Sequence, residues 1–307
     1  MAGLGPALAL LLASAYLPAA AAEPAAPSRS DTDTVAARLD PSQRLRVPVR
    51  IGESGPFRFL VDTGAQKTIV GSALAASLAL PPAGKRAVIT VAGRTIVDTV
   101  RIERLTLGSR RYNGVVAPVL SEVNIGADGI VGLDSLQHQR LLLDFTRNLF
   151  VINGPADDAT DPGDAEGFDI VVRARRRLGQ LIITTARIDG VPVDVVIDTG
   201  ADTSIGNRAL QASLARSRRA PTTLVDVTGK RITADLGVAG EISVGSLRIR
   251  NVTIAFADAL PFRHLDLDRR PAILLGMQVL RAFKRIGVDF AKRQVLFDYD
   301  AATLQPE

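Results

Sequence analysis

Short apolar runs alternate with turns along most of the chain. Residues 46–51 form one such run, a turn begins at Gly52, and a second strand leads into an apolar run that ends at Val61. A matching pattern occurs at residues 181–188, where the turn is Asp189-Gly190. Runs of β-branched residues bounded by glycine and aspartate are typical of β-hairpins. The pattern therefore predicts a chain built mainly from strands.

Two further features occur once in each half of the chain. A hairpin with a central glycine is predicted at residues 87–97 and again at residues 223–233, and each would form a flap over a bound chain. An apolar-apolar-Gly element follows at Ile130-Val131-Gly132 and at Leu274-Leu275-Gly276, ahead of a short helical stretch. The same order of elements in both halves predicts a duplicated, mostly β unit.

The sequence between the two copies is acidic, rich in proline and glycine, and almost free of large apolar residues. Such a composition is typical of a solvated linker. The predicted organisation is a signal peptide at 1–22, a mobile N-terminal stretch at 23–42, a first lobe at 43–153, a linker at 154–168 and a second lobe at 169–303.

The N-terminus is rich in alanine and leucine, and small residues precede Glu23. This pattern predicts a signal peptide that is cleaved after Ala21 or Ala22, and therefore an exported protein, periplasmic or secreted. No Lys or Arg precedes the apolar stretch, so an uncleaved anchor helix is the alternative. The apolar run is short for crossing ~30 Å of hydrocarbon, and we expect no stable membrane insertion after signal removal.

Composition narrows the possible chemistry. The chain has 307 residues, of which 47% are hydrophobic, enough for a sizeable core. It has no cysteine, which excludes disulfides, thiol nucleophiles and thiolate metal sites. Aromatic residues make up only 4%, which argues against a nucleic-acid partner that needs stacking platforms. The two histidines, His138 and His264, lie far apart, so we predict no metal and no cofactor.

The net charge of +5 comes from arginines that are spread along the chain. The densest group is Arg173, Arg175, Arg176 and Arg177. We interpret it as a solvated strand edge or hairpin, with contact to an anionic surface as the alternative.

The tripeptide Asp-Thr-Gly ends an apolar run in each half, at Asp62-Thr63-Gly64 and at Asp198-Thr199-Gly200. One copy could be a turn after a buried strand. Two copies in the same context indicate an acid–base pair. Two adjacent carboxylates cannot both ionise, and they therefore share a proton. One group then acts as general base while its neighbour acts as general acid.

These features resemble the aspartic proteases, and the retroviral-like branch more than the pepsin-like branch. The resemblance covers residues 43–303 and rests on the two tripeptides and the two apolar-apolar-Gly elements. It implies an all-β fold with two retropepsin-like β-barrel lobes in one chain. The lobes would form an intramolecular pseudo-dimer with the active site in the cleft between them.

The resemblance also implies roles for individual residues. Asp62 and Asp198 match the catalytic pair that activates a water molecule without a covalent intermediate. The neighbouring positions match residues that brace the loops (Thr63, Thr199), that let the substrate approach the backbone (Gly64, Gly200) and that bind the substrate main chain (Asp202, with Gln66 at that place in the first copy).

The function implied is that of a monomeric aspartic endopeptidase acting on a polypeptide substrate. One alternative is a non-catalytic peptide-binding module that retains the protease fold. A second alternative keeps the lobes apart, each paired with the same lobe of another chain, and predicts a dimer.

Two departures from the family pattern bear on the chemistry. Lys67 is unusual beside an acid site, and either points to solvent or lies near the aspartates and lowers their pKa. Ala65 and Ala201 stand where pepsin-like sites carry a hydroxyl that favours the ionised aspartate. We therefore expect the pair to hold its shared proton to higher pH, with activity at mildly acidic to near-neutral pH.

Overall fold

The structure is a computed structural model that describes residues 12–13, 32–137, 139–153, 167–214 and 219–299. Most of the predicted signal peptide and linker, together with His138, lies outside these residues. Within them, no helix is long and apolar enough to span a membrane.

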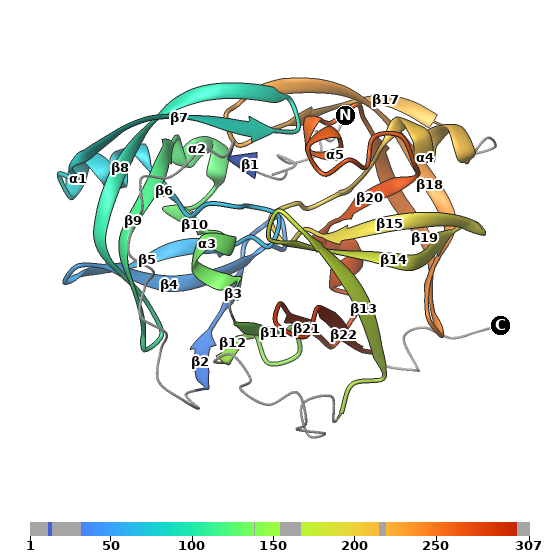
Figure 1. The fold of residues 1–307 in the computed structure, drawn as a ribbon, viewed down its shortest axis with the longest axis horizontal. Helices are drawn as coiled ribbons and strands as arrows, with labels where there is room; N and C mark the ends of the chain where they lie inside the picture. The colour runs from blue at the N-terminus through green and yellow to red at the C-terminus, as the bar shows by residue number, and fades with distance from the viewer. Residues whose placement is uncertain (1–11, 14–31, 138, 154–166, 215–218, 300–307) are drawn as a thin grey trace.

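Strands dominate both halves of the chain (Figure 1). The elements up to the linker are β1 (Leu12–Ala13), β2 (Asp33–Ala36), β3 (Arg38–Leu39), β4 (Leu45–Ile51), β5 (Ser54–Val61), β6 (Ile69–Gly71), α1 (Ser72–Ser77), β7 (Pro82–Thr90), β8 (Gly93–Leu107), β9 (Arg110–Leu120), α2 (Glu122–Ile125), β10 (Gly129–Val131), α3 (Leu133–Leu136), β11 (Arg140–Asp144) and β12 (Leu149–Asn153). Those after it are β13 (Ile170–Arg177), β14 (Gln180–Ile188), β15 (Val191–Ile197), β16 (Ser204–Gly206), α4 (Arg208–Ser213), β17 (Arg219–Val225), β18 (Arg231–Val244), β19 (Leu247–Phe256), α5 (Leu260–His264), β20 (Ala272–Leu275), α6 (Met277–Leu280), β21 (Arg285–Asp289) and β22 (Gln294–Asp298).

The two lobes have the same topology. In the first, the strand order β7-β8-β9-β6-β10-β5-β4 closes on itself through an additional β8–β4 pairing. In the second, β17-β18-β19-β16-β20-β15-β14 closes through β18–β14. In each lobe, the strand that precedes the Asp-Thr-Gly tripeptide runs parallel to the strand of the apolar-apolar-Gly element. These pairs are β5 with β10 and β15 with β20, and their ends lie side by side. The prediction of an all-β protein with two retropepsin-like lobes is confirmed.

A shared sheet joins the lobes below the centre of Figure 1. Its order is β2-β12-β11-β21-β22-β13, so each lobe contributes three strands. The central pairing joins β11 of the first lobe to β21 of the second. Across this boundary Leu143 pairs with Ile286 and Leu141 with Val288, all four buried. One buried apolar cluster contains these residues and extends into both lobes. The fused lobes therefore have a common core.

Two short strands lie within the N-terminal stretch, residues 23–42. Residues 33–39 form β2 and β3, and β2 pairs with β12 along the edge of the shared sheet. The reason is that Val35 and Ala37 are both buried against the lobe core, while their neighbours face outward. The polar composition of residues 23–42 concealed this short alternating pattern.

The shared sheet makes a stability prediction. Ile286→Ala removes buried side-chain atoms from β21 and should lower the free energy of unfolding by about 2–5 kcal/mol. The matched control Ile96→Ala, at a position that is 68% exposed, should change it by less than about 0.5 kcal/mol. Urea denaturation should show one cooperative transition; two separate transitions would mean that the lobes do not depend on the shared core.

Candidate active site

Two loops meet where the lobes face each other. Strand β5 ends at Val61 and β15 ends at Ile197, and the next residue in each case is the aspartate of an Asp-Thr-Gly tripeptide. The N–H of Asp62 donates to the Val131 carbonyl at 3.1 Å, and the N–H of Asp198 donates to the Leu275 carbonyl at 3.1 Å. The parallel strand beside each loop therefore fixes the backbone position of its aspartate.

The apolar-apolar-Gly elements allow the loops to pack closely. A Cβ at Gly132 would lie 2.5 Å from the Lys67 carbonyl carbon, and one at Gly276 would lie 2.7 Å from the Asp202 carbonyl oxygen. Only glycine leaves enough space for such an approach of two backbones. The residue after each glycine donates its N–H back to the loop, Leu133 to Ala65 and Met277 to Ala201, both at 2.8 Å.

The two threonines of the tripeptides hold the loops together. Thr63 Oγ1 donates to the Ile197 carbonyl at 2.7 Å and accepts the N–H of Thr199 at 3.3 Å. Reciprocally, Thr199 Oγ1 donates to the Val61 carbonyl at 2.7 Å and accepts the N–H of Thr63 at 3.0 Å. All of these groups are buried. We call this set of four hydrogen bonds the threonine bridge.

The threonine bridge brings Asp62 and Asp198 together. A Cβ on Gly200 would lie 2.2 Å from Asp62 Oδ2, so the Asp62 carboxyl packs directly against the loop that carries Asp198. Asp62 Oδ1 accepts the N–H groups of Gly64 and Ala65 at 2.7 and 3.0 Å. Asp198 Oδ1 accepts the corresponding pair, Gly200 and Ala201, at 3.1 and 3.2 Å. Both side chains are almost completely buried.

The surroundings of Asp62 act on its protonation. Burial raises the pKa of Asp62 to about 6, although the hydrogen bonds from Gly64 and Ala65, the positive charge of Arg44 and a hydrogen bond with Asp198 lower it. Burial has this effect because it disfavours the charged form of a carboxyl. The arrangement is therefore suited to keeping a proton between two carboxyls near neutral pH.

The two predicted substrate-binding residues have different surroundings. Asp202 is partly buried; desolvation raises its pKa, while the charge of Arg44 lowers it and that of Asp40 raises it. Gln66 uses its side-chain nitrogen to donate to the Leu178 carbonyl of the second lobe at 2.8 Å. Asp202 is thus a charged position, whereas Gln66 is neutral and already hydrogen-bonded across the lobe boundary.

Lys67 points toward a carboxylate of its own lobe. Its Nζ lies 3.7 Å from Asp134 Oδ2, and 44% of its side chain is exposed. Asp134 in turn accepts the N–H and the hydroxyl of Thr68 at 2.8 and 2.9 Å. Burial raises the pKa of Asp134, while Lys67 and the Thr68 hydrogen bonds lower it. Lys67 therefore pairs with Asp134 at the edge of the loop.

Each lobe carries a long hairpin, and we name these hairpins the first flap (β7–β8) and the second flap (β17–β18). The tip of each flap packs against the opposite lobe. Ile89 and Val91 of the first flap belong to a buried cluster made mainly of second-lobe residues. Val227 of the second flap is buried in a cluster of first-lobe residues that includes Ala65 of the aspartate loop. Both predicted hairpins are present, and each is longer than the sequence pattern indicated.

Hydrogen bonds join the two flap tips. The Thr90 hydroxyl of the first flap donates to Asp226 Oδ2 of the second, and both residues are fully buried. Lys230 Nζ donates to the Arg94 carbonyl at 3.2 Å. Asp226 Oδ1 also accepts the N–H groups of Thr228 and Lys230, which fixes the tip. The two flap tips are therefore hydrogen-bonded to each other.

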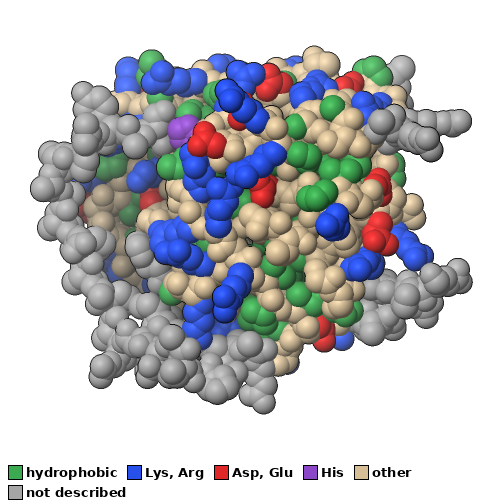
Figure 2. Space-filling model, turned by 45° about the vertical axis from the view of Figure 1, so that its right-hand side comes forward, with side chains coloured by type: hydrophobic (Ala, Val, Ile, Leu, Met, Phe, Trp, Pro, Cys, Tyr) green, Lys and Arg blue, Asp and Glu red, His purple; other side chains and the backbone are tan. Residues whose placement is uncertain are grey.

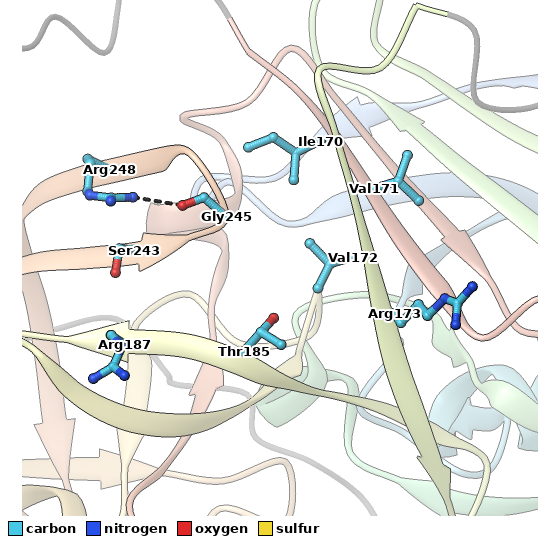
Figure 3. Close-up of a pocket in the computed structure, with 9 residues that line it drawn as sticks. All are labelled: Ile170, Val171, Val172, Arg173, Thr185, Arg187, Ser243, Gly245 and Arg248. Carbon is cyan, nitrogen blue, oxygen red and sulfur yellow. Dashed lines mark hydrogen bonds between the residues drawn. The ribbon is translucent and has the colours of Figure 1, made fainter.

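The arginine-rich segment forms β13, in which Arg173 pairs with β22 while residues 174–177 pair with β14 in a hairpin. Figure 2 shows many Lys and Arg side chains on the face that the turned view brings forward. In the second lobe, Arg175 and Arg270 both pair with Asp194, at 3.9 and 2.7 Å. A cavity of about 410 Å³ opens on this lobe, and Figure 3 shows its lining, which includes Arg173, Arg187 and Arg248. None of its lining residues belongs to the aspartate loops.

Two residues at the site were not singled out from the sequence. Arg44 is 2% exposed and pairs with Asp40 at 2.7 Å. Gln180 is 1% exposed and donates to the Gly64 carbonyl at 2.7 Å. They stand at the same distance before the two Asp-Thr-Gly tripeptides. Extending the alignment of the two copies upstream by these residues would have identified them as equivalent polar positions.

The described residues contain no group of three or more His, Asp or Glu side chains suited to a metal ion. The polar groups at the loops include the two carboxyls, the backbone N–H groups that bind them, and the threonine hydroxyls.

Sequence comparison identifies the class. The chain matches the aspartyl protease family over residues 47–135 and again over residues 184–279, more than half of its length in total. It therefore belongs to the aspartyl protease family, and the two matched regions confirm the two tandem units. A comparison with curated proteins found no match to this chain.

The threonine bridge can be tested by removing one hydroxyl. Thr63→Val leaves the Ile197 carbonyl and the Thr199 N–H without their partner, and should lower the free energy of unfolding by about 1–3 kcal/mol. Thr63→Ser keeps the hydroxyl and should lose less. Chemical denaturation compares them; equal stabilities for the Val and Ser variants would show that the hydrogen bonds carry no net stabilisation.

Proposed function

We propose that this protein is an aspartic endopeptidase in which Asp62 and Asp198 activate a water molecule for attack on a peptide bond. The observation that carries the proposal is the threonine bridge, which holds two buried aspartates against each other at the boundary of the lobes. Membership of the aspartyl protease family supports a protease-type function in general terms.

The proposed chemistry follows from one shared proton. An ionised carboxylate takes a proton from water as the water attacks the carbonyl carbon, and the protonated carboxyl donates to the carbonyl oxygen. The tetrahedral intermediate then collapses as the carboxyl that took the proton of water donates it to the leaving amine, and the other carboxylate takes back a proton from a hydroxyl of the intermediate. Thr63 and Thr199 hold the loops, while Gly64 and Gly200 leave room for the substrate backbone. Asp202 and the side-chain oxygen of Gln66 are proposed to bind the substrate main chain.

The flaps support an extended polypeptide as substrate. The outer edge of β7 in the first flap pairs antiparallel with Leu12–Ala13, which forms β1. Pairing to an exposed sheet edge is a common way to bind extended peptides, because the main-chain hydrogen bonds do not depend on side-chain identity. A substrate requires the flap tips to separate, since Val91 and Val227 are buried between the lobes.

We further propose that the protein is exported and acts as a monomer. Residues 1–22 carry the pattern of a signal peptide. Both halves of the proposed site come from one chain, so no second copy is needed to complete it. Sedimentation of the mature protein should give the mass of one chain.

The catalytic pair is tested by Asp62→Asn and Asp198→Asn. Each should lower kcat on peptide substrates by at least about 10³-fold, because an amide cannot serve as base or acid. Asp266→Asn is the control, since this residue makes an exposed ion pair with Arg177 on the second lobe. Full activity in either dyad variant would overturn the proposal, and a wild type that binds peptides without cleaving them would support a non-catalytic binder.

The pH dependence follows from the same pair. Because burial raises the pKa of Asp62 to about 6, this carboxyl is protonated well below that pH and cannot then act as the base. The value of kcat/KM should therefore fall as the pH drops through roughly 6 and should be greatest near neutral pH. A pH–rate profile measures this, and a maximum below about pH 3, in the range of an unperturbed or pepsin-like pair, would contradict the account.

A further inference from the structure

One peptide group connects the second lobe to the Asp62 carboxyl. The carbonyl of Gly64 accepts a hydrogen bond from Gln180 Nε2 at 2.7 Å. The N–H on the other side of the same peptide group, that of Ala65, donates to Asp62 Oδ1 at 3.0 Å. A peptide group is planar, so holding its oxygen also sets the direction of its N–H. Gln180 therefore aims a donor at Asp62 from the opposite lobe.

Among the described residues, the equivalent position in the first copy makes a different contact. Arg44 stands where the first copy would place the equivalent of Gln180, and its Nε donates to Asp40 at 2.9 Å. The two loops have the same sequence, Asp-Thr-Gly-Ala, yet the donors lie closer to Asp62, at 2.7 and 3.0 Å, than to Asp198, at 3.1 and 3.2 Å. Of these donors, the N–H of Ala65 is the one in the peptide group that Gln180 holds, and it lies 3.0 Å from its aspartate against 3.2 Å for the N–H of Ala201.

The charges around Asp62 also favour its ionised form. Arg44, from the segment before β4, places a positive charge near Asp62. Asp198 faces it from the other loop, and Lys67 on its own loop is paired with Asp134. Shorter hydrogen bonds from N–H donors and a nearby positive charge both favour the ionised form of a carboxyl.

We propose that Gln180 is a positioning residue that makes the two aspartates unequal, so that Asp62 ionises first and Asp198 keeps the shared proton in the free protein. For catalysis, which rests on the function proposed above, Asp62 is then the base that receives the proton of water. Asp198 is the acid that donates to the carbonyl oxygen. Gln180 itself does not contact the reacting atoms and acts only through the peptide group of Gly64.

The test removes the donor while keeping the size of the side chain. Gln180→Met retains an unbranched chain of the same length, and Gln180→Glu is a second variant in case the first fails to fold. Each should move the acid limb of the kcat/KM profile upward by roughly half to one pH unit, because Asp62 loses support for its ionised form. The control is Gln137→Met, which removes a hydrogen bond from Arg176 across the same lobe boundary. Its acid limb should coincide with that of the wild type.

A second measurement needs no substrate. Carboxyl ¹³C NMR, with signals assigned through Asp62→Asn and Asp198→Asn, follows the two groups directly in the folded protein. The expected result is that Asp62 titrates first in the wild type and shifts to higher pH in Gln180→Met. The proposal is overturned if Asp198 titrates first, or if both Gln180 variants titrate like the wild type while only their thermal stability falls. A wild type that cleaves no peptide would refute the proposed function, and the NMR titration would still decide the role of Gln180.

Discussion

The reciprocal hydrogen bonds between Thr63 and Thr199 are the constraint on which the rest of the site depends. Each hydroxyl is buried and reaches a carbonyl at the end of the opposite lobe's central strand, so neither loop can move without breaking the other's contacts. The parallel strand pairs position the loops, and the shared sheet keeps the lobes in register. Together they force two carboxyls into a space from which water is largely excluded, where sharing one proton costs less than ionising both.

Much of this arrangement could be predicted from the repeats. The tripeptides and the apolar-apolar-Gly elements are local signals, and their purpose is visible in the packing of Gly132 and Gly276 against the loops. Contacts between the copies could not be predicted in the same way. The exchange of Val91 and Val227 between lobes, and the hydrogen bond from Gln180, join residues far apart in sequence, which no local pattern records. The role of Lys67 was left open for the same reason, because its partner Asp134 lies on another element.

Duplication gave the chain two copies of one loop, and divergence around them made the copies unequal. The first lobe supplies Arg44, Lys67 and Asp134 around the site, whereas the matching positions of the second lobe are neutral. Asp202 in the second copy corresponds to the neutral Gln66 of the first. A peptide lying across the lobes would therefore meet a different electrostatic environment on each side, which a pair of identical subunits cannot provide. Asp62 and Asp198 are therefore residues of the same type in different electrostatic environments.

The most direct test of the central claim is a count of protons. A potentiometric difference titration compares the folded wild type with the double variant Asp62→Asn/Asp198→Asn, so that only the pair contributes. A shared proton predicts that one proton is released near pH 6 and the second only at clearly higher pH. Release of both protons near pH 4, where isolated aspartates titrate, would show that the pair does not share a proton.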